Sequence, residues 1–127
     1  MDWNIRSDLP IYSQLVEQIK LGIVSGSFLP GERLASVRDM AAEAGVNPNT
    51  MQRALQELER EGMVYSQRTA GRFVTENMSV IELAKHRFAE EQIQSFLQAM
   101  EKLGYRRGEI LAMLEERKTE ENANTGM

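Results

Sequence analysis

The chain has 127 residues, with 15 basic and 19 acidic side chains and a formal net charge of −4. It has no cysteine, which excludes disulfides and thiolate metal sites, and no apolar run near the roughly 20 residues that span a bilayer. We therefore expect a cytoplasmic protein without a membrane partner, built as one compact domain or as a small domain with an appendage.

The charges are unevenly distributed along the chain. Residues 44–56 contain no acid and one base, Arg53, whereas residues 62–75 contain no acid and two bases, Arg68 and Arg72. The acidic total argues mildly against a nucleic-acid partner. Because DNA responds to local potential, however, the two acid-free segments matter more than the sum.

Three helices are predicted in the first half of the chain. A four-residue repeat of apolar side chains predicts the first over 11–25. Ser36 is suited to cap a second helix that Gly45 ends, and Asn47 is suited to cap a third that Gly62 ends. Two short helices separated by a glycine turn are typical of a helix-turn-helix.

Two strand-like runs follow, at 63–67 and 72–75, and they predict a β-wing. Ser79 with Glu82 resembles a capping box and predicts the start of a long helix that Gly104 ends.

The polar tail completes the predicted domain organisation. We expect a short helix over 107–117 and a disordered segment over 118–127. The fold class is thus mainly α with a small β-wing: a winged helix-turn-helix over 1–76 and a two-helix dimerisation region over 79–117.

The third helix carries the candidate DNA-reading face. Its apolar side chains cluster on one side, and Asn49, Gln52, Arg53 and Gln56 fall roughly opposite. Arginine pairs with guanine, and asparagine or glutamine with adenine, in the major groove. The alternative is an ordinary solvated face, although such faces usually favour glutamate and lysine.

Other residues are candidates for phosphate contacts. Arg38 either contacts phosphate or pairs with Asp39 or Glu43. The hydroxyls of Ser36 and Thr50 suit phosphate and local capping equally well. The whole predicted DNA-binding set is Ser36, Arg38, Asn47, Asn49, Thr50, Gln52, Arg53, Gln56, Arg68, Thr69, Gly71 and Arg72.

The long apolar stripe of the predicted tail needs a partner. It packs either on the winged helix of the same chain or, as we prefer, against a second copy in a two-fold dimer. The predicted dimer interface is Ile81, Phe88, Ile93, Phe96, Leu97, Met100 and Leu103. A tail of about 40 residues leaves little room for an effector pocket, so an unknown small-molecule effector would need a cleft at that interface.

Signals for catalysis and cofactors are weak. His86 is the only histidine, no nucleophile-and-base set is visible, and no glycine-rich phosphate loop occurs. We expect neither a cofactor nor a metal, and we do not expect an enzyme. The alternative function is a winged-helix protein-interaction module that does not bind DNA, which the acidic total would suit.

The sequence resembles the GntR family of bacterial regulators, and within it the YtrA subfamily. The resemblance covers residues 9–75 and is carried by Pro10-Ile11-Tyr12-x-Gln14-Leu15, Gly26-x-x-Leu29-Pro30-Gly31-x-x-Leu34-x-Ser36-x-Arg38, Gly45-Val46-Asn47-Pro48-Asn49-Thr50, Gly62-Met63-Val64 and Gly71-x-Phe73-Val74.

The resemblance implies a homodimeric repressor on a palindromic operator, near a transporter operon in the YtrA subfamily. It implies DNA contacts from Arg38, from the start of the third helix and from the wing tip. The chain departs from the family pattern at Ala35, where proline is usual, and at Thr69, where the wing usually has glycine. Loss of that glycine restricts the turn.

Overall fold

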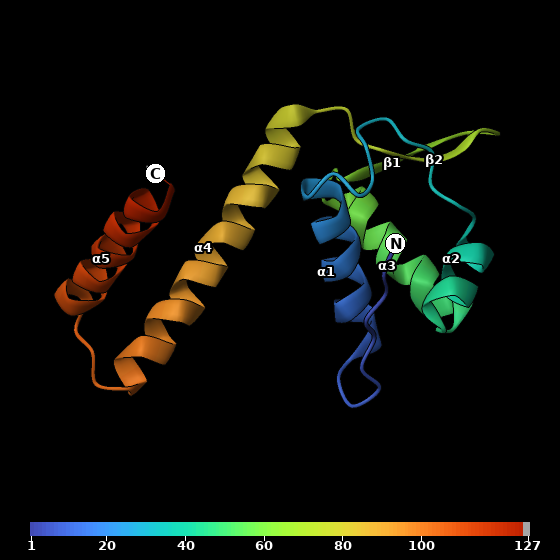
Figure 1. Cartoon of the computed structure of the whole chain (residues 1–127). Coiled ribbons are helices and arrows are strands. Elements are labelled where there is room, and N and C mark those ends of the chain that lie inside the picture. The colour runs from blue at the N-terminus through green and yellow to red at the C-terminus, as the bar shows by residue number, and fades with distance from the viewer. Residues whose placement is uncertain (126–127) are drawn as a thin grey trace. The chain divides into compact units, whose positions relative to one another are not determined.

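The computed structural model describes residues 1–125, with side-chain surroundings through residue 121. The elements in chain order are α1 (Ile11–Val24), α2 (Val37–Ala44), α3 (Pro48–Arg60), β1 (Val64–Gln67), β2 (Gly71–Val74), α4 (Met78–Lys102) and α5 (Arg107–Thr125) (Figure 1). They form two compact units, Met1–Arg87 and Phe88 onward, and the division falls inside α4. The predicted class, mainly helical with a small antiparallel wing, is confirmed.

The core of the first unit lies where α1 and α2 pack on α3 and the wing closes one end. Its side chains come from the apolar faces predicted for these helices and from both strands. The largest of its fully buried side chains are Leu15, Ile19, Met51, Leu55, Leu58, Met63, Val64 and Val74.

The two helices of the helix-turn-helix begin where their capping residues predict. Ser36 Oγ accepts a hydrogen bond from the Asp39 N–H at 3.1 Å, and Asn47 Oδ1 accepts one from the Asn49 N–H at 2.8 Å. Gly45 ends α2 in the left-handed region at φ 72°, which a side chain would disfavour. These bonds fix the α2–α3 turn locally.

The wing is an antiparallel hairpin in which Tyr65 pairs with Phe73 and their rings stack at 5.6 Å. An extended segment around Arg33 pairs with the free side of this two-stranded sheet, next to β2, through an isolated bridge that sequence patterning did not predict. Arg33 forms a β-bridge with Phe73, and the Leu34 N–H donates to the Arg72 carbonyl at 2.9 Å.

The N-terminal segment is held against α1 by two side-chain amides. Gln14 accepts from the Arg6 N–H and donates to the Arg6 carbonyl, both at 2.8 Å. Gln18 accepts from the Asn4 N–H at 3.0 Å and donates to the Asn4 carbonyl at 2.8 Å. Each glutamine side chain thus satisfies one backbone N–H and one carbonyl of this segment, as a neighbouring strand would.

The start of α4 differs from the prediction. The cap is Asn77, whose Oδ1 accepts from the N–H groups of Ser79 and Val80 at 3.0 and 3.4 Å, so Ser79 lies inside the helix. Asn77 rather than Ser79 is the cap because the N–H of Asn77 is held by the Thr75 hydroxyl at 3.0 Å, directly after β2. The predicted Ser79 cap was therefore wrong.

The end of α5 differs too. The helix starts at Arg107 as predicted, with the Arg106 N–H bound to Glu109 Oε1 at 3.0 Å, but it continues to Thr125. The predicted disorder over 118–125 is thus corrected to helix, because no glycine or proline ends it there. Residues 126–127 of that prediction lie outside the described residues. None of the described helices is long and apolar enough to cross a membrane.

Candidate nucleic-acid interface

The outward face of α3 is polar and free of acid over its first half. Asn49, Arg53 and Gln56 are exposed and Gln52 is half-buried, whereas the opposite side of the helix forms the core. The structure therefore brings these four predicted residues together on one accessible face. Two amides, a guanidinium and an asparagine at the helix start are the groups that read base edges.

Arg53 is held from the side by α1. Its guanidinium carbon lies 4.7 Å from the centre of the Tyr12 ring, a cation–π contact. The guanidinium remains exposed, so the contact orients the charge without removing it from solvent. Ordering the side chain in advance reduces the entropy that binding would cost.

The carboxylates near the end of α3 form ion pairs with basic side chains. Glu57 accepts from Arg60 Nε at 2.9 Å, Glu59 from Arg72 Nε at 2.7 Å, and Glu61 lies 2.5 Å from Lys20 Nζ.

The Arg60 hydrogen bond is the main reason that the pKa of Glu57 lies below its ordinary value, and it raises the pKa of Arg60 in turn. These pairs lessen the repulsion that free carboxylates beside the polar face would exert on a phosphate backbone.

Arg38, at the start of α2, is exposed and forms no ion pair among the described residues. The predicted alternative partners do not hold it: Glu43 instead lies 3.4 Å from the Met1 amine. Ser36 is exposed but its oxygen caps α2, and Thr50 is half-buried. Arg38 is thus the cation at this end of the polar face that is left available to a ligand.

The predicted DNA contacts on the wing are of two kinds, exposed residues at the turn and an arginine bound to α3. Arg68 and Thr69 are exposed at the turn, and Thr69 adopts a left-handed φ of 71°. Arg72 is bound to Glu59 on α3, and its side chain is 20% exposed. The geometry therefore makes Arg72 a brace between the wing and α3, whereas Arg68 stays available.

The second unit exposes several large apolar side chains of the predicted interface. Ile93 is 52% and Leu103 74% exposed, Phe96 is exposed, and Phe88, Leu97 and Met100 are half-buried.

Ile81 is different, because it is 4% exposed and belongs to the core of the first unit. Ile81 is therefore removed from the interface set. On α5, exposed Leu111, Met113 and Leu114 were not predicted to contribute.

A known protein family matches the part of the chain that holds the helix-turn-helix and the wing. The family described as "Bacterial regulatory proteins, gntR family" matches residues 11–74. The chain belongs to the GntR family. It is a transcriptional regulator with a winged-helix DNA-binding domain, and the predictions of the family and of a non-enzymatic protein are confirmed.

Two Bacillus subtilis GntR relatives cover most of the chain. "Uncharacterized HTH-type transcriptional regulator YhcF" is 39% identical over 111 residues, covering 87% of this chain and 92% of its own length. "HTH-type transcriptional repressor YtrA" is 37% identical over 93 residues, 72% of each chain. The predicted likeness to YtrA is confirmed.

Solved structures of GntR proteins resemble the chain as well. A "GntR family transcriptional regulator from Listeria monocytogenes" matches with a TM-score of 0.79 and 36% identity, covering 88% of this chain and 98% of that one. The AraR DNA-binding domain in complex with operator ORX1 matches with a TM-score of 0.50 and 28% identity, covering 59% and 93%.

One exposed arginine near the GntR wing was missed from the sequence. Arg33 forms an isolated bridge to β2, and the position that a β-carbon on Gly71 would occupy is 3.2 Å from Arg33 Nε. The stretch Gly31-Glu32-Arg33-Leu34 has no strand pattern of its own. Its link to the wing is a long-range pairing that periodicity does not reveal.

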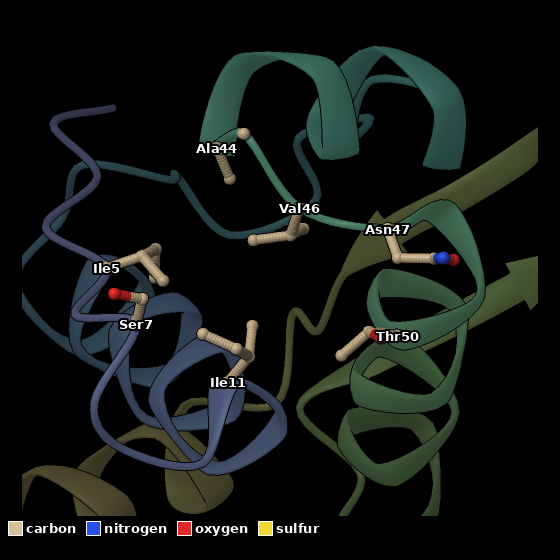
Figure 2. A pocket seen from close by; sticks show the side chains of 8 residues that line it. Ile5, Ser7, Ile11, Ala44, Val46, Asn47 and Thr50 are labelled. Atoms are coloured by element: carbon tan, nitrogen blue, oxygen red, sulfur yellow. The ribbon is translucent and has the colours of Figure 1, made fainter.

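A cavity of about 340 Å³ adjoins the start of α3 (Figure 2). The N-terminal segment forms one wall with Ile5 and Ser7, and Ile11 of α1 lies beside them. The opposite wall is the α2–α3 turn, with Val46 toward the cavity and Thr50 at its edge. No group of three or more potential metal ligands occurs in the part of the chain that is described.

Proposed function

We propose that this GntR protein binds a palindromic operator as a homodimer and represses the genes beside it. The observation that carries the proposal is the exposed, acid-free face of α3, with Arg53 oriented over Tyr12. In a helix-turn-helix, the N-terminal part of the second helix enters the major groove, which would bring Asn49, Gln52 and Arg53 to base edges.

The comparisons support the finer parts of the proposal. The AraR domain is named as a complex with its operator, and YtrA is named as a repressor. Within the predicted set, Arg38 and Arg68 are the residues proposed to contact phosphates, because they are exposed and have no ion-pair partner among the described residues. The regulated operon is proposed to encode a transporter, as the YtrA likeness implies.

Dimerisation is supported by the apolar surface of the second unit. Ile93, Phe96 and Leu103 expose large apolar side chains that a soluble monomer would leave in water. Burying this surface against its copy gives a two-fold axis, and two reading heads about one DNA turn apart. A palindromic operator is the DNA symmetry that such a dimer requires.

The test uses a duplex that carries the region upstream of the protein's own gene, titrated with the full chain by fluorescence anisotropy. Arg53→Ala should weaken operator binding by about 1–3 kcal/mol and relax preference at one base pair per half-site. Arg38→Ala should weaken all sequences alike and reduce the magnitude of the slope of log K against log salt by about 1.8, because each half-site loses one phosphate contact. Arg117→Ala, on α5, is the matched control and should change neither.

Other outcomes of these measurements would contradict the proposal. Binding that does not depend on salt, or no binding to upstream DNA, would favour the protein-interaction module instead. Unchanged base preference in Arg53→Ala would contradict the assignment of the reading face.

A further inference from the structure

The basic side chains within residues 1–76 fall into two groups of four. The first group forms ion pairs with carboxylates: Arg6, Lys20, Arg60 and Arg72. The second group forms no ion pair with any described residue: Arg33, Arg38, Arg53 and Arg68. Three of the second group are predicted DNA contacts. Arg33 is the member without an assigned role.

The backbone places Arg33 on the outer face of the wing. Residues directly opposite in an antiparallel pair project to the same face, so Arg33 shares a face with Phe73 and, across the hairpin, with Tyr65. Val64 and Val74 occupy the other face and are buried in the core. Arg33 is accordingly exposed.

Gly71 directs the guanidinium toward the wing turn. It lies two residues before Phe73 on β2 and therefore faces the same side as Arg33. Without a side chain, it leaves room for the arginine: Nε and Nη2 lie 3.2 and 3.6 Å from the position of a β-carbon there. The Arg33 side chain thus runs along the hairpin toward the turn that carries Arg68.

We propose that Arg33 is a DNA-contacting residue that binds a backbone phosphodiester beside the wing turn. This inference rests on the proposed function. Arg72, the other wing arginine near this position, is held by Glu59, so Arg33 supplies the charge that Arg72 does not. Phosphate is the expected target because a guanidinium donates two parallel hydrogen bonds to its oxygens, and most protein–DNA hydrogen bonds go to the backbone.

The experiment measures affinity against salt for the full chain on two duplexes of about 30 base pairs, long enough for two half-sites. One duplex carries the upstream region and the other a scrambled sequence. Arg33→Gln keeps most of the side-chain length and removes the charge, and Arg33→Lys keeps the charge. Arg117→Gln removes one charge from α5 as the matched control.

Each protomer of the proposed dimer would lose one phosphate contact, so Arg33→Gln should reduce the magnitude of the salt slope by about 1.8 per dimer, equally on both duplexes. The affinity ratio of wild type to variant should therefore shrink about 12-fold between 50 and 200 mM salt. Arg33→Lys and Arg117→Gln should keep the wild-type slope, and the thermal unfolding midpoint of Arg33→Gln should be unchanged.

A wild-type slope in Arg33→Gln would overturn the inference. So would a lowered unfolding midpoint with an unchanged slope, which would make Arg33 a packing residue of the wing. If Arg38→Ala loses slope and Arg33→Gln does not, only this inference fails. If the wild-type protein shows no salt-dependent binding to either duplex, the proposed function fails with it.

Discussion

Thr69→Gly should stabilise the protein, although glycine usually destabilises. Thr69 is the third residue of the wing turn, which the Ala70 N–H closes by donating to the Gln67 carbonyl at 3.1 Å. Its φ of 71° is the only left-handed value among the described non-glycine residues. A β-branched side chain is poorly tolerated in that region, so the turn is held in a strained conformation by the strands around it.

Two opposing terms set the magnitude. The left-handed conformation costs an L-residue about 1–2 kcal/mol relative to glycine. Glycine restores flexibility to the unfolded chain, which costs about 0.4–1 kcal/mol. The net gain in unfolding free energy therefore lies between about 0 and 1.6 kcal/mol, and its central value near 0.8 kcal/mol corresponds to a rise in melting temperature of roughly 2–6 °C for a domain of this size.

Urea denaturation at one fixed protein concentration measures this gain, because dimerisation would otherwise shift the midpoint. Ala70→Gly is the matched control: Ala70 lies next in the same turn without a left-handed φ, so glycine there should cost roughly 0.5–1 kcal/mol. If Thr69→Gly lowers the midpoint as much as Ala70→Gly does, the turn is not strained and the reasoning is refuted.

Three further substitutions test the packing and the charges. Burial raises the pKa of Glu59, but hydrogen bonds from Ser66 and Arg72 outweigh it and leave the pKa below its ordinary value. The stability that this carboxylate contributes is thus fully present above its pKa in the unfolded chain and is lost as pH falls through its pKa in the folded protein. Glu59→Gln should therefore lower the unfolding free energy by roughly 1 kcal/mol at neutral pH. The variant's stability should also fall less steeply toward acid pH than that of the wild type. Phe96→Glu should convert the proposed dimer to a monomer in light scattering; an unchanged dimer mass would contradict the proposed interface. Ile81→Ala should lower the unfolding free energy by about 2–4 kcal/mol at unchanged native mass, and the reverse pattern would return Ile81 to the interface.

The helix-turn-helix was predictable because its signals are local. Ser36 and Asn47 each bond to an N–H two or three residues away, and Gly45 adopts its φ within the same turn. The polar face of α3 follows directly from helical periodicity, so its exposure could also be predicted. Neither conclusion required knowledge of a distant residue.

The errors arose where distant residues decide. Asn77 and Ser79 are both good caps by sequence, and the end of β2, through Thr75, selects Asn77. Ile81 continues the stripe of α4 but meets the winged-helix core, because periodicity shows that a face is apolar and not what covers it. Arg33 was missed since its place beside the wing is set only by the isolated bridge to Phe73 of β2.

Deamidation of Gln14 or Gln18 would have an effect well beyond α1. Each amide nitrogen donates to a backbone carbonyl, and glutamate, though equal in size, has no donor to offer in its place. The deamidated side chain would keep the bond that its oxygen accepts and lose those that its nitrogen donates, so the segment with Ile5 and Ser7, which line the space beside the first turn of α3, would be held less firmly. Chemical ageing of two glutamines would thus loosen one wall of that space without altering any residue predicted to contact DNA.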